Sequence, residues 1–146
     1  MRAAGALWNE VTKHYSSEKL PIADENDRLY LKANISNAIT GSVGDKPIRK
    51  LLEGVLLKMA RTDFPARWPN MLGDTLQRLN SAKEMQDTYG CLLCIKAVIK
   101  SFEWVTDSKK NHTLVIQENV FPYFENIALN QLENYDQNSA RMVNMI

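Results

Sequence analysis

The sequence predicts an all-α protein, and three features of the chain lead to this prediction. Apolar residues recur three and four positions apart along most of the 146 residues, which is the spacing of one face of an α-helix. No segment alternates apolar and polar residues for long, as a half-buried strand would. Pro65 and Pro69 interrupt the helical pattern, because proline lacks the N–H that continues a helix. We therefore expect helical hairpins, with this proline pair in one of the turns.

The first part of the chain predicts three helices. Residues 2–16 carry an amphipathic pattern that begins almost at the first residue, and a core helix without a lead-in indicates a chain cut from something longer. Asp24 is a good N-cap for the next helix, which we expect to run to about Thr40. Asp45 can cap a third helix with a proline in its first turn, ending near Thr62.

The second part predicts four more helices. The segment from Asn70 to Asn80 is short and amphipathic, and Ser81–Glu84 has the sequence of a capping box, which marks the start of a helix over 82–104. Further helical patterns cover 113–134 and 137–146. Long and short helices with tight turns alternate in HEAT-type arrays. We therefore expect residues 1–146 to form a segment of one HEAT-repeat α-solenoid, with about three to four helix pairs.

The turn between the third and fourth helices has an unusual sequence, Asp63-Phe64-Pro65-Ala66-Arg67-Trp68-Pro69. Its two aromatic rings can pack between the helices, and we expect Trp68 to be substantially buried. The residues Asp63, Phe64, Pro65, Trp68 and Pro69 resemble the D-[YF]-P-x-x-W-P signature of the importin-β (karyopherin) superfamily, which joins two early HEAT repeats.

The resemblance covers about residues 3 to 135. Tyr89–Cys94 resembles the G-x-L-x-x-L helix that follows the signature, and the end at Ser101–Trp104 is similar to the importin seven/eight branch. The first helix departs from the family, because it has Asn9-Glu10 where a Lys-Asn pair is usual. The signature residues therefore carry most of the resemblance.

The composition excludes several classes of protein. The 18 basic and 17 acidic side chains leave a net charge of +1, which gives no sign of a dedicated nucleic-acid surface. No apolar run approaches the ~20 residues that cross a bilayer. Two cysteines do not make a disulfide framework. We expect a soluble intracellular protein with neither nucleic acid nor membrane as a direct partner.

No pattern of catalytic or metal-binding residues stands out. Cys91 and Cys94 have redox spacing, but they lie well inside a predicted helix, away from the N-terminus where thiolates are stabilised. A zinc site would need a second pair of ligands. His14 and His112 lie far apart and are expected on the surface or in loops. There is no phosphate-binding loop or nucleophile elbow. We expect no enzymatic activity, no cofactor and no metal.

The resemblance implies a nuclear transport receptor that binds Ran-GTP and protein cargo and shuttles between cytoplasm and nucleus, with nucleoporins as further partners. In that family the second (B) helices of the first repeats line a concave face that contacts Ran. By position, the B helices here are 2–15, 46–62 and 82–104, and Leu57 and Leu93 would be exposed among charges. The candidate partner-binding residues are Lys50, Glu53, Leu57, Arg61, Gln86, Leu93, Lys96 and Lys100.

A second interpretation stays open. A charged stripe on a helix is usually only solvated, and a helical-repeat scaffold or assembly protein without a GTPase partner would show the same pattern. The signature favours the transport receptor, because an ordinary HEAT repeat does not need a tryptophan such as Trp68 at its turn.

Overall fold

The computed structural model describes residues 2–15 and 25–103, together with residues 117, 118, 120–122, 124, 125 and 129. The chain divides into two compact units, Met1–Trp104 and Val105–Ile146. The described residues of the second unit are helical, and the rest of the helices predicted over 113–134 and 137–146 lies outside the described part.

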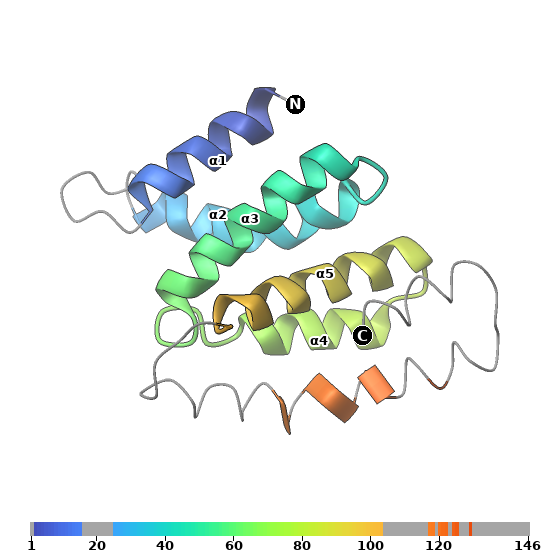
Figure 1. Cartoon of the computed structure of the whole chain (residues 1–146). Helices are drawn as coiled ribbons and strands as arrows, with labels where there is room; N and C mark the ends of the chain where they lie inside the picture. Colours follow the sequence, from blue (N-terminus) through green and yellow to red (C-terminus); the bar gives the residue numbers. More distant parts are fainter. Residues whose placement is uncertain are drawn as a thin grey trace. The chain divides into compact units, whose positions relative to one another are not determined.

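The described residues of the first unit form five helices (Figure 1). The described residues contain no strand, so the prediction of an all-helical protein is confirmed for them. This arrangement is compatible with a helical repeat. The helices are α1 (Arg2–His14), α2 (Glu25–Gly41), α3 (Lys46–Asp63), α4 (Met71–Ser81) and α5 (Met85–Ser101).

The boundaries of α3 follow from a cap and from prolines in the sequence. The Asp45 side chain accepts a hydrogen bond of 3.1 Å from the Ile48 amide at the start of α3, and Pro47 lies in the first turn, as predicted. The helix ends at Asp63, directly before the proline-containing corner, which spans Phe64–Asn70. The predicted cap Asp24 lies outside the described residues.

The predicted start of the fifth helix is wrong by three residues. Ser81 is the last residue of α4, and its hydroxyl donates to the Arg78 carbonyl oxygen at 3.1 Å rather than capping α5. Ala82 has an extended backbone, and α5 begins at Met85 without a side-chain cap. A capping serine must precede its helix, whereas here the buried Leu79 holds the final turn of α4 in the core.

The odd-numbered helices lie side by side, with α3 between α1 and α5 (Figure 1). Both α2 and α4 pack against α5, and α2 also contacts α3. All five helices contribute buried side chains to the core, and α4 contributes Met71, Leu72, Leu76 and Leu79. The fully buried side chains include Val11, Tyr15, Ile39, Val55, Leu56, Met59, Ile95 and Val98.

Two glycines allow the helices to approach closely. A Cβ atom at Gly54 on α3 would collide with the Trp8 ring of α1. A Cβ atom at Gly90 on α5 would lie 2.9 Å from the Thr40 Cα of α2 and in still closer contact with its hydroxyl. Because backbone cannot move aside as a side chain can, the α2–α5 crossing requires glycine at position 90.

Candidate functional site

A buried carboxylate ties three helices together where α3 ends. Asp63, 1% exposed, accepts a hydrogen bond of 2.7 Å from the Tyr15 hydroxyl just after α1. The Lys32 ammonium of α2 lies 2.8 Å from the same oxygen, Oδ2. The guanidinium of Arg67, in the corner, lies 3.4 Å from Oδ1. We call these four residues the Asp63 cluster.

Neighbouring contacts hold the partners of Asp63 in place. Lys32 also donates to the Arg67 carbonyl oxygen at 3.0 Å, which fixes the corner to α2. Arg28 donates to the Tyr15 carbonyl oxygen at 2.9 Å and lies 5.0 Å from the centre of the Tyr15 ring. Asp63 Oδ1 accepts no hydrogen bond from the described residues. The negative charge on this oxygen is therefore stabilised by the nearby charge of Arg67.

The Asp63 cluster shifts the protonation of two of its members in opposite directions. Burial alone would raise the pKa of the Asp63 carboxyl, but hydrogen bonds from Lys32 and Tyr15 and the charges of Lys32 and Arg67 outweigh it, and the pKa is lowered. Burial, followed by the hydrogen bond to the Asp63 carboxylate, raises the pKa of the Tyr15 hydroxyl above its ordinary value. Asp63 is therefore an anion and Tyr15 a neutral donor at neutral pH.

The two aromatic rings of the corner have different environments. Phe64 is buried and packs edge-on against Phe102, with 5.7 Å between ring centroids. Trp68 is only partly buried, and the Lys32 ammonium lies 5.9 Å from its ring centre. Most of the Trp68 surface is nevertheless buried, as expected, but Trp68 is less completely buried than Phe64, which fills the space beneath the corner.

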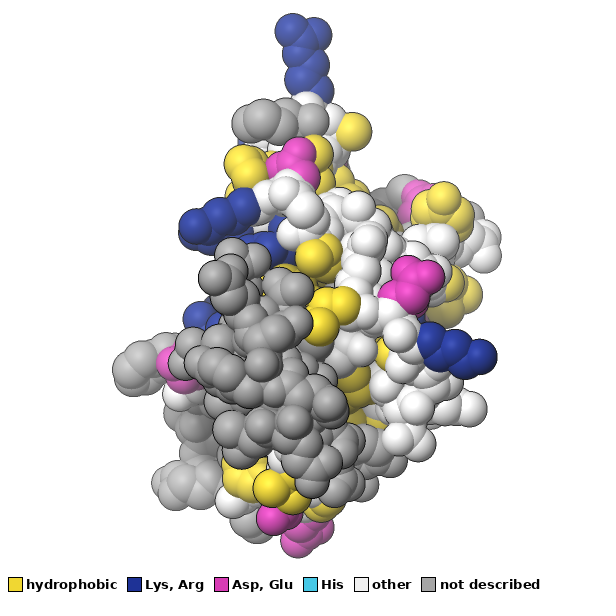
Figure 2. Space-filling model, turned by 90° about the vertical axis from the view of Figure 1, so that its right-hand side faces the viewer, with side chains coloured by type: hydrophobic (Ala, Val, Ile, Leu, Met, Phe, Trp, Pro, Cys, Tyr) yellow, Lys and Arg dark blue, Asp and Glu magenta, His cyan; other side chains and the backbone are white. Residues whose placement is uncertain are grey.

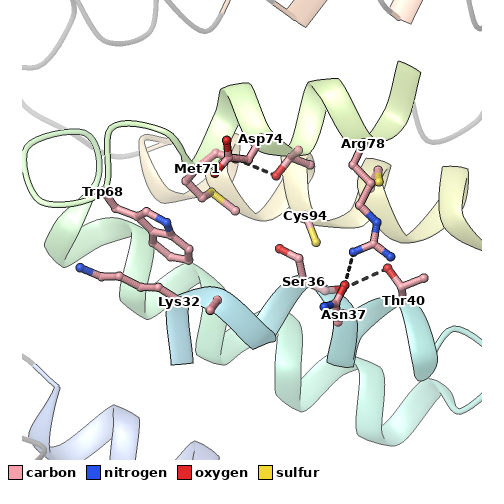
Figure 3. A pocket seen from close by; sticks show the side chains of 12 residues that line it. Lys32, Ser36, Asn37, Thr40, Trp68, Met71, Asp74, Arg78 and Cys94 are labelled. Carbon is pink, nitrogen blue, oxygen red and sulfur yellow. Dashed lines mark hydrogen bonds between the residues drawn. The ribbon is translucent and has the colours of Figure 1, made fainter. Parts of the chain in front are cut away.

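A groove lies between α2 and α4, with α5 at its base (Figure 3). Its volume is about 190 Å³, and Trp68 and Lys32 lie at one end with Arg78 at the other. A second hollow of about 290 Å³ shares Lys32 and Trp68 with it. The groove is lined by Lys32, Ala33, Ser36, Asn37, Thr40, Trp68, Met71, Asp74, Thr75, Arg78, Cys91 and Cys94.

The two cysteines at the base of the groove are free and buried. Burial raises the pKa of the Cys91 thiol, and it raises the pKa of the Cys94 thiol to about 12. Both thiols are therefore protonated at neutral pH and are poor nucleophiles and metal ligands. Their burial agrees with the interpretation of these residues as core cysteines.

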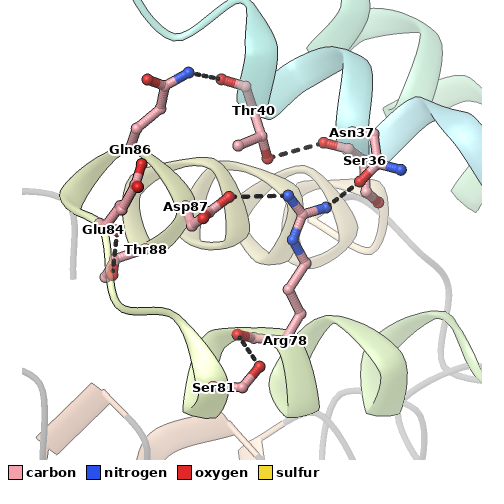
Figure 4. Close-up of polar contacts among 9 residues, drawn as sticks. All are labelled: Ser36, Asn37, Thr40, Arg78, Ser81, Glu84, Gln86, Asp87 and Thr88. Atoms are coloured by element: carbon pink, nitrogen blue, oxygen red, sulfur yellow. Dashed lines mark hydrogen bonds and ion pairs between the residues drawn. The ribbon is translucent and has the colours of Figure 1, made fainter.

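Polar side chains link α2, α4 and α5 near the Arg78 end of the groove (Figure 4). The Arg78 guanidinium donates to the Asn37 side-chain oxygen and, at 3.1 Å, to Asp87. The Gln86 amide donates to the Thr40 carbonyl oxygen at 3.0 Å. Gln86 was a candidate for partner binding, but the structure engages its amide in joining α5 to α2.

The candidate residues on α3 lie along one side of that helix. Lys50 and Arg61 are exposed, and Leu57 is partly buried between them in the sequence. Glu53 pairs with Arg49 at 3.1 Å within the same helix. Arg49 also lies over the Tyr89 ring of α5, 5.6 Å from its centre, so the Arg49 side chain reaches toward the start of α5.

The candidate residues on α5 divide into exposed and buried ones. Lys96 and Lys100 are exposed, but Leu93 is only 4% exposed. The expectation of an exposed Leu93 is therefore wrong, because α5 packs against α2, α3 and α4 and has only a narrow free side. Met85 and Ile99 of the same helix are exposed, Ile99 at 36%. The apolar residue among these lysines is thus Ile99.

The structure also bears on the charged surfaces, metal sites and membrane spans considered from the sequence. In the face shown in Figure 2, basic, acidic and hydrophobic side chains are interspersed among the described residues. Across the described ranges, no three metal-ligating side chains are grouped. His14 lies 3.8 Å from Glu10 on the same helix, while His112 lies outside the described part. No helix formed by the described residues has the length and apolar character needed to cross a membrane.

Comparisons with known proteins give one relevant similarity. The chain is 25% identical over 114 residues to a protein described as a probable importin-7 homolog of Dictyostelium discoideum. The match covers 77% of this chain and 10% of that protein, so the chain spans about a tenth of its relative's length. No family model and no solved structure matches. The similarity suggests an importin-like helical family.

Proposed function

We propose that this chain is a segment of a nuclear transport receptor that binds Ran-GTP and supports transport of protein cargo between cytoplasm and nucleus. The observation that carries the proposal is the corner after α3. The signature residues Asp63, Phe64 and Trp68 form a joint between two helices, which is where the resemblance to the importin-β superfamily requires one. The similarity to the importin-7 homolog is independent support.

The arrangement of the helices supports a HEAT-type solenoid. In this proposal α1, α3 and α5 are the B helices of successive pairs, since α3 lies between the other two. The intervening helices α2 and α4 are then the first (A) helices, separated by the groove. Residues 1–146 would be part of a longer array in which cargo and nucleoporins bind mainly elsewhere.

The proposed Ran surface is the free side of the B helices α3 and α5. Ran carrying GTP differs from Ran carrying GDP mainly in its switch segments, which are ordered around the γ-phosphate. A rigid row of helices can distinguish these shapes. Lys50, Arg61, Lys96 and Lys100 are the exposed candidates on this surface. A catalytic role is not part of the proposal.

The test is a pull-down of the full-length parent protein with Ran loaded with either nucleotide. We expect capture of Ran-GTP but not Ran-GDP, and weaker capture by the double variant Lys50→Glu/Arg61→Glu. The control Lys13→Glu/Lys83→Glu makes the same charge change at two other exposed residues. Equal capture of both forms, or of neither, would contradict the proposal and favour a helical-repeat scaffold without a GTPase partner.

A further inference from the structure

We infer that the free side of α3 and α5 binds an acidic protein segment that places carboxylates around an apolar side chain. We call this surface the basic face and define it by Lys50, Leu57 and Arg61 on α3 and by Lys96, Ile99 and Lys100 on α5. The position of this surface is taken from the proposed function, on which the inference therefore rests. The inference adds the chemistry of the partner and does not require that partner to be a GTPase.

The cations of the basic face are available to a partner. Lys50, Arg61, Lys96 and Lys100 are exposed, and none of them forms an ion pair or a side-chain hydrogen bond with another described residue. By contrast, Lys32 is engaged with the buried Asp63. Among the described residues, the buried Lys32 is thus paired with an anion, whereas these four cations are not.

The nearby carboxylates are largely engaged by other cations. Glu53 on α3 pairs with Arg49, and Asp87 on α5 pairs with Arg78. The exposed Glu103 follows the end of α5 and offsets part of the charge at that end. The balance on the basic face is therefore positive, and an acidic segment complements it.

The dimensions of the basic face fit a short segment. Lys50 and Arg61 are separated by eleven residues of one helix, which corresponds to about 16 Å at the rise of an α-helix. About five residues of extended chain cover this distance. Arg49 lies over Tyr89, so α3 and α5 adjoin, and a segment along α3 can reach Lys96 and Lys100 as well.

An apolar side chain in the segment would have neighbours on this surface. Leu57 is partly buried between Lys50 and Arg61 in the sequence, and Ile99 is 36% exposed between Lys96 and Lys100. Interfaces with an apolar centre and a charged rim are common among protein complexes. The whole chain carries a net charge of only +1, which favours a protein segment over nucleic acid.

Fluorescence anisotropy of the 146-residue chain with labelled peptides tests the inference. The probe is a twelve-residue peptide with six glutamates around a central leucine pair. Two further peptides replace the leucines by alanine or the glutamates by lysine, and a twelve-nucleotide single strand of DNA represents nucleic acid. The protein variants are Lys50→Glu/Arg61→Glu and Lys96→Glu/Lys100→Glu, with Lys13→Glu/Lys83→Glu as the charge-matched control.

We expect the acidic leucine peptide to bind, and each variant of the basic face to weaken binding by about tenfold or more, since it replaces two attractions by repulsions. The control should change the Kd by less than threefold, and circular dichroism should show the same melting temperature for all variants. The inference is overturned if the peptide does not bind, if the control weakens binding equally, or if the DNA binds more tightly. Peptide binding without Ran-GTP binding by the full-length protein would contradict the proposed function alone.

Discussion

The two connections on either side of α4 are built on different principles. The corner after α3 contains the buried Phe64 and is held by Lys32 and Tyr15, whose partner Asp63 is 31 and 48 residues away in the sequence. The connection between α4 and α5 is held by local bonds, such as the one from the Ala82 amide to the Leu79 carbonyl oxygen three residues earlier. Its residues Lys83 and Glu84 are exposed.

This difference shows where the orientation of the helices is determined. A connection held by contacts from α1 and α2 fixes the direction of the chain relative to the core. A connection held by local bonds only has to span the gap between two helices that already pack against each other, as α4 and α5 do. We therefore expect substitutions in the corner to destabilise the protein strongly and those in the α4–α5 connection to have little effect.

The largest effect is expected for Phe64→Ala. Removing this buried ring leaves a cavity beside Phe102, at a cost of about 3–5 kcal/mol in the free energy of unfolding. Trp68→Ala should cost less, about 1–2 kcal/mol, because the ring is partly exposed and loses less buried area. Urea denaturation of both variants measures the difference. A larger loss for Trp68→Ala would contradict the assignment of Phe64 as the residue that fills the corner.

The next effect is expected for Asp63→Ala. This change leaves the mostly buried Lys32 ammonium without its anion. The free energy of unfolding should fall by about 3 kcal/mol, the lower end of the range for a broken buried ion pair. The lower end applies because Arg67, the other cation beside Asp63, is 61% exposed. Asp74→Ala removes an exposed acid from α4 and should cost less than about 1 kcal/mol. Thermal unfolding of both variants gives the comparison, and equal melting temperatures would show that the Asp63 cluster does not hold the corner.

A smaller and pH-dependent effect is expected for Tyr15→Phe. Loss of the hydrogen bond to the Asp63 carboxylate should cost about 1.5–3 kcal/mol at neutral pH. The pKa of Tyr15 is raised in the folded protein, so its contribution is complete below the ordinary value of 10.0 and is lost as the pH rises above it. The parent should therefore lose stability above about pH 10, whereas the variant should lose less.

The acid side of the same profile depends on Asp63. Its pKa is lowered on folding, so its contribution is present above the ordinary value of 3.8 and is lost as the pH falls below it. Melting temperatures measured between pH 2 and pH 11 for the parent, Tyr15→Phe and Asp63→Asn would separate the loss of stability at low pH from the loss at high pH. If Asp63→Asn loses as much stability at low pH as the parent does, other carboxylates are responsible for that loss.

The smallest effect is expected for Ser81→Ala. A capping serine contributes about 1 kcal/mol, but Ser81 is exposed in the last turn of α4 and caps nothing. Its removal should change the free energy of unfolding by less than about 0.5 kcal/mol. Asp45→Ala, which removes an actual cap, provides the matched comparison. A loss at Ser81 as large as that at Asp45 would restore the predicted capping box.

The exposure of the candidate partner-binding residues shows what helical periodicity alone can predict and what it cannot. Lys50, Arg61, Lys96 and Lys100 are exposed as predicted, since a long cation is rarely buried without a partner. Leu93 was expected to be exposed but is buried, whereas Ile99 on the same helix is exposed. These two aliphatic side chains on one helix differ in exposure because different neighbours lie opposite them. The sequence does not reveal how many helices surround α5.

The sequence by itself determined the helices and the position of the main corner. Helical periodicity, the cap Asp45 and the two prolines act over a few residues and need no knowledge of the rest of the chain. Only the tertiary structure decided that Asp63 pairs with Tyr15 and Lys32, that Phe64 rather than Trp68 fills the corner, and that Ser81 belongs to α4. These outcomes depend on the packing of segments tens of residues apart, which local propensity does not encode.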